Sequence, residues 1–147
     1  MSSHQAANEM ASLVDLEDLI CGLTILGTGG GGRPEAGRAA LVPLVEAGAR
    51  LVWTSLESLP DGGTYCSLGG LGSIAPIEPL GDDERQAAGY PLEMIPEQPM
   101  VVAARALQGL VGRTIDGVYP VELGAGNSTT TLAASVAMGV QMIDCDC

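Results

Sequence analysis

The sequence predicts an α/β domain, in which helices and strands alternate along the chain. Three features point to this class: apolar residues at helical spacing, short apolar runs typical of buried strands, and glycine-rich turns between them. Residues 117–146 are predicted as strand, glycine loop, helix and strand, which is the order of a βαβ unit. We therefore expect a largely parallel or mixed sheet with helices packed on it.

Two helices are predicted in the first third of the chain. The first covers about 16–26, because its leucines and isoleucine fall on one face, and Asp15 is placed to cap it. The second begins at Pro34, a residue suited to the first turn of a helix, and ends at Gly48. Both helices precede the first predicted strand.

Two strands and a long connection follow. Residues 51–54 predict a short buried strand, and 64–71 form a weaker candidate because glycines interrupt it. Residues 73–99 are rich in proline and carry the acidic cluster 82–84. We expect them to form a long surface excursion, either an ordinary ordered loop or a lid or partner-binding arm.

The last third returns to regular alternation. A helix is predicted over about 100–111, a strand over 115–123 and a helix over 128–138. Gly139 ends that helix, and the apolar run 140–143 predicts a final strand.

Composition restricts the partners. The 147 residues include six basic side chains, all arginine, and eighteen acidic ones, for a net charge of −12. Phosphate backbones and anionic membrane surfaces attract basic patches, which this chain lacks, so neither nucleic acid nor membrane is an expected partner.

The N-terminal residues 1–11 are expected to form a disordered tail, which leaves a single domain over 12–147. The tail has neither the basic start nor the apolar core of a signal peptide, and no apolar run has the length of a membrane span. The four cysteines are scattered, which favours reduced thiols and a cytoplasmic location.

Two glycine-rich loops, 26–34 and 122–128, each open a predicted helix. Such loops let the backbone approach a ligand closely, and a helix N-terminus offers free N–H groups and a positive dipole end. A small molecule is therefore the expected partner. The candidate ligand-binding residues are Thr28, Gly29, Gly30, Gly31, Gly124, Gly126, Asn127 and Ser128.

For each loop, a purely structural role remains an alternative to ligand binding. The first contains a formal G-x-G-x-x-G, but a predicted helix precedes it where a dinucleotide fold has a strand, so a nucleotide fingerprint is disfavoured. It is either a tight helix–helix turn or a backbone surface for a ligand or another chain. In the second loop, Asn127 fits a helix cap better than a catalytic group, and the four hydroxyls of 128–131 could bind an anion.

Glu122 is the outstanding residue of the second loop. It lies at the end of an apolar strand, where α/β proteins place their sites. A carboxylate there could act as a general base or a metal ligand. The alternative is a structural carboxylate that accepts backbone N–H groups from the loop.

Asp144, Cys145, Asp146 and Cys147 form the second candidate cluster. An extended chain places both aspartates on one face and both cysteines on the other. The aspartates could hold a hard divalent ion, and the cysteines a soft ion such as zinc, although two thiols do not complete a zinc site. The alternative for Cys147 is that it belongs to a frayed polar chain end without a functional role. The catalytic candidates are thus Glu122, Asp144 and Asp146, with Asp144 and Asp146 as metal ligands.

Taken together, the two glycine motifs resemble those of a known family. Leu26 to Gly32 followed by Pro34, and Glu122 to Ser128 followed by an alanine-rich helix and Ile143-Asp144-Cys145-Asp146, are similar to the N-terminal domain of the S-methyl-thiohydantoin desulfurase-like family. Pro76 to Leu80 also looks like that family's linker. The likeness extends from Asp15 over nearly the whole chain.

The resemblance implies the front part of a longer protein, often encoded near hydantoinase- and oxoprolinase-like enzymes. The implied chemistry is hydrolytic attack on a five-membered cyclic thiohydantoin or a related ring. In the family, the Asp-x-Asp motif runs on into a Gly-Arg-x-x-Pro-Glu stretch and a further domain, whereas this sequence ends at Cys147.

Two hypotheses follow. The first is part of a hydrolase site for a cyclic amide or thioamide, with a divalent ion as its possible cofactor. The second is a non-catalytic subunit that binds an anionic metabolite or docks a partner. In either case we expect a homo-oligomer, or a complex with a second subunit that supplies the missing C-terminal part, because a terminal strand with a free edge invites pairing.

Overall fold

The chain folds into a five-stranded mixed sheet with helices packed on it, as the computed structural model of residues 8–70, 80–90 and 98–147 shows. The strand order is β1-β2-β5-β4-β3. β1 pairs antiparallel with β2, and the other three pairings are parallel. The predicted α/β class is therefore confirmed. The strands are β1 (Asn8–Met10), β2 (Leu51–Ser55), β3 (Tyr65–Leu68), β4 (Gly117–Pro120) and β5 (Gln141–Asp144).

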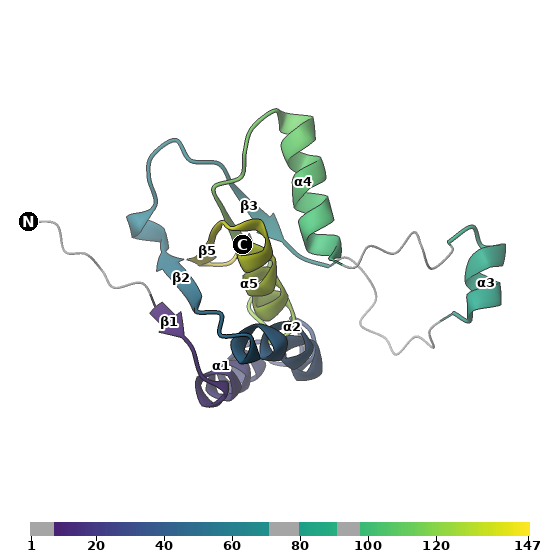
Figure 1. Cartoon of the computed structure of the whole chain (residues 1–147), viewed down its shortest axis with the longest axis horizontal. Coiled ribbons are helices and arrows are strands. Elements are labelled where there is room, and N and C mark those ends of the chain that lie inside the picture. The colour runs from purple at the N-terminus through teal and green to yellow at the C-terminus, as the bar shows by residue number, and fades with distance from the viewer. Residues whose placement is uncertain (1–7, 71–79, 91–97) are drawn as a thin grey trace, which may run out of the picture.

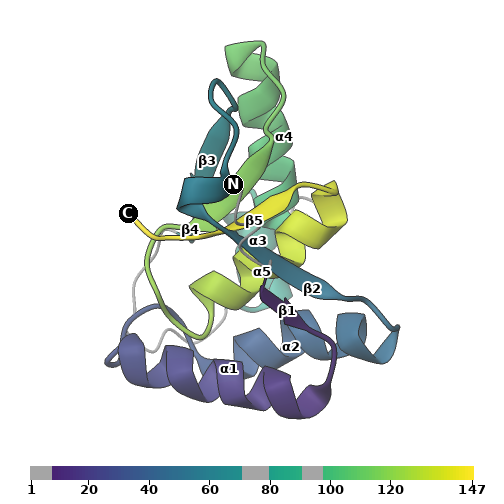
Figure 2. The same cartoon turned by 90° about the vertical axis from the view of Figure 1, so that its left-hand side faces the viewer.

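Helix α5 is the centre of the helical layer. It contacts β2, β4 and β5 on one side and the neighbouring helices α2 and α4 on the other (Figures 1 and 2). Helix α1 packs on α2. The helices are α1 (Leu13–Leu26), α2 (Pro34–Glu46), α3 (Asp82–Ala87), α4 (Pro99–Val111) and α5 (Asn127–Met138), with a 3-10 turn η1 at Leu56–Ser58.

Two apolar clusters hold the helices to the sheet. One joins α1, α2 and α5 to β1, β2 and β5, and includes Leu16, Leu41 and Leu51, each 0% exposed. The other joins α4 and α5 to β3 and β4, and includes Val118, also 0% exposed. Burial of these side chains supplies the main driving force for folding.

The βαβ prediction for 117–146 is confirmed by β4, α5 and β5, with β4 and β5 as parallel neighbours. Glycines with left-handed backbone end two helices here: Gly112 has φ +66° after α4, which precedes the unit, and Gly139 has φ +68° after α5, the helix of the unit.

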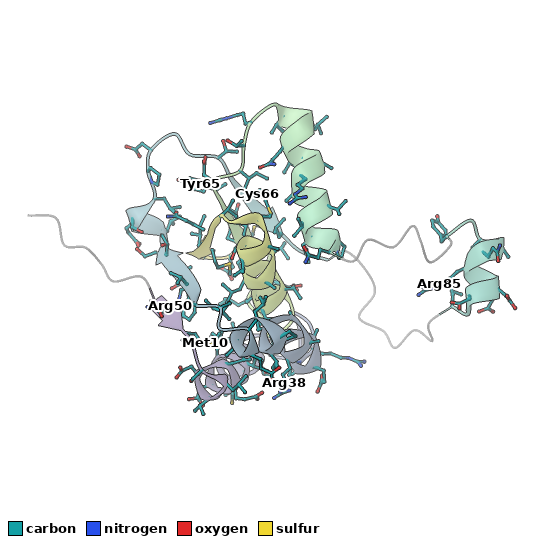
Figure 3. All side chains as sticks on the ribbon, in the orientation of Figure 1. Met10, Arg38, Arg50, Tyr65, Cys66 and Arg85 are labelled. Carbon is teal, nitrogen blue, oxygen red and sulfur yellow. The ribbon has the colours of Figure 1, made fainter. Side chains whose placement is uncertain are left out.

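The N-terminal tail prediction is wrong for its last part. Residues Asn8–Met10 form β1, and Met10, labelled in Figure 3, is only 2% exposed. Pairing with β2 and burial of one large side chain offset the entropy of ordering this segment. Residues 1–7 lie outside the described part of the chain.

The start of α1 also differs from the prediction. The helix begins at Leu13, and its cap is Ser12, whose hydroxyl accepts a hydrogen bond from the Asp15 N–H at 3.1 Å. Asp15 is therefore a first-turn residue rather than the cap.

The described part of the segment 73–99, predicted as a long surface excursion, contains a short helix, α3. Arg85 lies on it, apart from the sheet (Figure 3). The stretches 71–79 and 91–97, which include the linker-like Pro76 to Leu80 up to residue 79, lie outside the described residues.

The position of the last strand contradicts the expected free edge. β5 lies between β2 and β4, in the middle of the sheet, and the edges are β1 and β3. Among the helices of 8–70, 80–90 and 98–147, none has the length and apolar character of a membrane span.

Candidate functional site

The two glycine loops pack against each other. The Gly31 carbonyl accepts hydrogen bonds from the N–H groups of Gly126 at 2.9 Å and Asn127 at 2.8 Å. A Cβ added at Gly31 would collide with the Gly124 backbone, and one at Gly124 would collide with Gly31. A Cβ at Gly32 would lie 2.8 Å from the Gly126 Cα. These glycines are needed because two backbones meet there.

Residues 28–30 of the same loop, which we call its open half, do not pack on the second loop. Thr28 has φ +47° and Gly29 has φ +96°. Thr28, Gly29 and Gly30 are exposed, and nothing lies within 4 Å of a Cβ built at Gly29. Of the candidate ligand-binding residues in this loop, these three have the exposure that contact with a ligand requires, whereas Gly31 is buried.

Glu122 follows β4 by two residues and is exposed. Its Oε1 accepts a hydrogen bond at 3.0 Å from the Asn127 side-chain amide. Asn127 is the first residue of α5, and Gly126 precedes it as the N-cap, so the expectation that Asn127 caps the helix is wrong. Its amide orients the carboxylate instead.

The hydroxyls at the start of α5 are engaged with backbone. Ser128 Oγ accepts from the Gly124 N–H at 3.3 Å. Thr129 donates to the Ala125 carbonyl, and Thr130 donates to the Gly126 carbonyl at 2.7 Å. Thr131 is buried and lies 3.5 Å from the Leu68 carbonyl. These bonds hold the second loop on the helix, and they leave less capacity for an anion than four free hydroxyls would.

Asp144 is the last residue of β5, and Asp146 follows two residues later; both are exposed. The Cys145 N–H donates to the Ile143 carbonyl at 3.0 Å, which marks a tight turn at Asp144 instead of an extended continuation. Cys147 is exposed, and its thiol donates to Ser67 Oγ at 3.3 Å, so it is held against β3.

Burial raises the pKa of the Cys145 thiol, and the neighbouring Asp146 carboxylate raises it further. With no metal bound, the Cys145 thiol is therefore protonated at neutral pH. Across 8–70, 80–90 and 98–147, no three His, Cys, Asp or Glu side chains gather as a metal site would require. The described residues therefore do not supply a complete metal site by themselves.

A pocket of about 100 Å³ lies where β4 and β5 end; we call it the strand-end pocket. Ser128 at the start of α5 and Asp144 at the end of β5 both line it, so two of the predicted site residues meet there. Its other walls include Leu19 and Leu23 from α1, Trp53 from β2 and Leu132 from α5. The sequence patterns place Leu19 and Leu23 on an apolar helix face and Trp53 in a strand, because neither pattern separates a pocket wall from a core face.

The second glycine loop borders this pocket, and the first loop packs on the second. Leu123 and Ser128 line the pocket, and a Cβ at Gly27 would lie 3.2 Å from the Gly124 Cα, but no residue of 26–34 is among the described lining residues. The two loops and the pocket are therefore one continuous region, at the edge of the sheet where parallel strands present their carboxyl ends.

A larger cavity of about 830 Å³ lies elsewhere, along the starts of β3 and β5. It is lined by Thr54, Tyr65 and Asp116, and the Asp116 carboxylate accepts a hydrogen bond from the Thr64 N–H at 2.8 Å. None of the predicted site residues is among the described residues that line it. Ligands of open α/β sheets bind at carboxyl strand ends, so we favour the smaller pocket.

Fold and site together define an α/β domain with a pocket at the carboxyl ends of its central parallel strands. The chain belongs to the S-Me-THD-like family, because the model of that family's N-terminal domain matches residues 14–147. The match includes both glycine loops, Glu122, Asp144 and Asp146, and it confirms the resemblance seen in the motifs. Comparison with curated proteins and with solved structures gave no significant match.

Proposed function

We propose that this domain binds a small cyclic amide or thioamide, of the hydantoin or thiohydantoin type, and supplies part of a hydrolase site. The observation that supports this most strongly is that Ser128, at the start of α5, and Asp144, at the end of β5, line one pocket although they are sixteen positions apart in sequence. The pocket size suits part of a small ring compound.

In this proposal Glu122 activates a water molecule. Its carboxylate is exposed and is held at 3.0 Å by the Asn127 amide, so it is solvated and oriented at once. Asp144 accepts an N–H of the ring at the pocket mouth. The backbone N–H of Gly29, in the open half of the first loop, stabilises the negative charge that develops on the attacked carbonyl oxygen, whereas the Gly30 N–H already donates to the Gly27 carbonyl at 2.7 Å.

The test is Glu122→Gln in the protein assembled with its remaining domain or subunit. We expect folding to be unchanged and turnover of the ring substrate to fall by at least about a hundred-fold, the lower range for loss of a general base. Glu46→Gln, an exposed glutamate at the end of α2, is the matched control. Unchanged turnover in Glu122→Gln would exclude its role.

A divalent ion belongs to the same proposal. Asp144 and Asp146 offer oxygen ligands of the kind that hard cations prefer, and the ring or another chain would complete the set. A ligand that binds only the folded state raises its melting temperature. We therefore expect Mg²⁺, Mn²⁺ or Zn²⁺ to raise the melting temperature, and Asp144→Asn to abolish the shift.

A non-catalytic role is the second candidate, and the packing of the loops favours it. Gly31, Gly124 and Gly126 have structural reasons to be glycine, and Glu122 has a hydrogen-bond partner on its own loop. Stabilisation by anionic metabolites without any effect of divalent ions would support a binding or assembly subunit instead of the hydrolase.

We also propose that the chain works as a homo-oligomer or with a second subunit. Because β5 has no free edge, strand pairing does not support this proposal. The support comes from exposed apolar surface. Leu110 on α4 is 84% exposed, and an apolar groove of about 530 Å³ runs between α2, α4 and α5. Light scattering with size exclusion at low micromolar concentration should give a mass above one chain; a monodisperse one-chain species that binds ligand would contradict this.

The four cysteines are free, which supports a cytoplasmic location as part of the same proposal.

A further inference from the structure

We propose that the strand-end pocket accepts a small aliphatic substituent of the bound ring, and that Leu19 and Trp53 set the size of substituent that fits. The ring itself rests on the proposed function, whereas the apolar pocket rests on the contacts around it.

The pocket is apolar inside and polar at one side. Leu23 is 7% exposed, Leu132 is 3% exposed and Met142 is 8% exposed, so these walls are buried. Asp144 also lines the pocket but is exposed, which puts a carboxylate where the pocket meets solvent. A ligand with a polar ring and a short apolar branch satisfies both parts, because the ring can bond to Asp144 while the branch leaves water.

The volume limits the branch. The volume is about 100 Å³, and a water molecule in the liquid takes roughly 30 Å³, so the space suits on the order of three to four heavy atoms. Isopropyl and isobutyl groups are of this size, while a benzyl group is larger. Each methylene moved from water into such a space increases affinity about three- to four-fold.

Leu19 and Trp53 are the adjustable walls. Both are partly buried rather than fully enclosed, unlike Leu23 and Leu132, so a change of size at Leu19 alters the pocket more than it alters the core. Trp53 is also the only tryptophan of the chain, so its fluorescence reports directly on occupancy of this pocket.

The experiment titrates the full chain with 5-methyl-, 5-isopropyl-, 5-isobutyl- and 5-benzylhydantoin, and follows Trp53 emission and heat of binding. A ring-free probe, xenon under pressure, is followed by ¹²⁹Xe NMR, because dry apolar cavities take up xenon. Leu19→Ala enlarges the pocket and Leu19→Phe fills it. Leu13→Ala, an exposed leucine on the same helix, is the matched control.

We expect affinity to rise about thirty-fold or more from methyl to isobutyl, which adds three carbons, and to fall for benzyl. Leu19→Ala should shift the optimum towards benzyl, Leu19→Phe should abolish the rise and the xenon signal, and Leu13→Ala should change neither. Xenon binding that Leu19→Phe removes, without any hydantoin binding, would support the apolar pocket and count against the proposed ring substrates.

Two results would overturn the inference. One is hydantoin binding that depends neither on the 5-substituent nor on Leu19, which would leave the proposed function standing. The other is the absence of both hydantoin and xenon binding in folded wild-type protein.

Discussion

The two halves of the first glycine loop use glycine for different reasons. Gly31 and Gly32 face the backbone of the second loop, so closely that a Cβ at either would meet Gly124 or Gly126. Gly29 has a similar left-handed backbone, with φ +96°, but open space around it. The comparison shows that one run of glycines can combine a packing requirement with a surface that remains free for a ligand.

The packed half should be the most sensitive part of the loop. Gly31→Ala and Gly124→Ala each force one backbone away from the other, and Gly31 also has φ +69°. We expect each to lower the free energy of unfolding by about 3 kcal/mol or more, which combines overpacking with backbone strain. Urea unfolding measures it, and losses below about 1 kcal/mol would mean that the loops can separate at little cost.

The open half should tolerate a side chain at a moderate cost. Gly29→Ala places a Cβ in free space but in a left-handed conformation, so we expect a loss of about 1–2 kcal/mol in the free energy of unfolding. The same urea experiment compares it with Gly31→Ala. Equal losses at Gly29 and Gly31 would contradict the division of the loop into two halves.

Gly22 is a reference for the effect of adding a Cβ at a glycine that has free space and lies within a helix. It lies inside α1, and nothing lies within 4 Å of a Cβ built there. Gly22→Ala should therefore raise the free energy of unfolding by about 0.5–1 kcal/mol, since alanine loses less entropy in a helix. A loss of stability would show that space around these glycines is a poor guide to their substitution.

The smallest expected effect is on the pH dependence of the free energy of unfolding, which should differ between the first glycine loop and the sheet. Residues 26–32 contain no titratable side chain, so the cost of Gly31→Ala should not vary with pH. Burial raises the pKa of the Cys66 thiol on β3 above its ordinary 9.0. The unfolded chain then loses its proton first, so this thiol's contribution to stability is retained below pH 9.0 and declines as the pH rises above it. Urea unfolding between pH 7 and pH 10, in wild type and Cys66→Ala, measures this decline in stability. If the decline is unchanged in the variant, a group other than Cys66 causes it.

Much of the fold could be predicted because local signals and packing agree. Periodic leucines, Pro34 at a helix start and Gly139 at a helix end are local signals, and the structure has helices and ends at those places. β1 could not be predicted, because three residues with one buried methionine carry no periodic pattern and depend on pairing with β2. The central position of β5 is likewise set by pairing that sequence position does not reveal.

The site was predictable in part for the same reason. Ser128 and Asp144 follow apolar strand patterns, and parallel strands bring their ends to one edge. Leu19 and Trp53 were not identified as pocket residues, since apolar side chains that line a pocket look the same in sequence as those that fill a core. The contact between Gly31 and Gly124 joins loops 93 positions apart, which no local pattern encodes.

The central claim is that the strand-end pocket, and not the larger cavity at the strand starts, binds the ligand. Calorimetry with 5-isopropylhydantoin on Asp144→Asn and Asp116→Asn tests it directly, because each substitution removes one carboxylate from one of the two cavities. We predict that Asp144→Asn weakens binding about ten-fold or more, the loss of a charged hydrogen bond, and that Asp116→Asn leaves it within about two-fold. Weakened binding in Asp116→Asn with unchanged binding in Asp144→Asn would contradict the account.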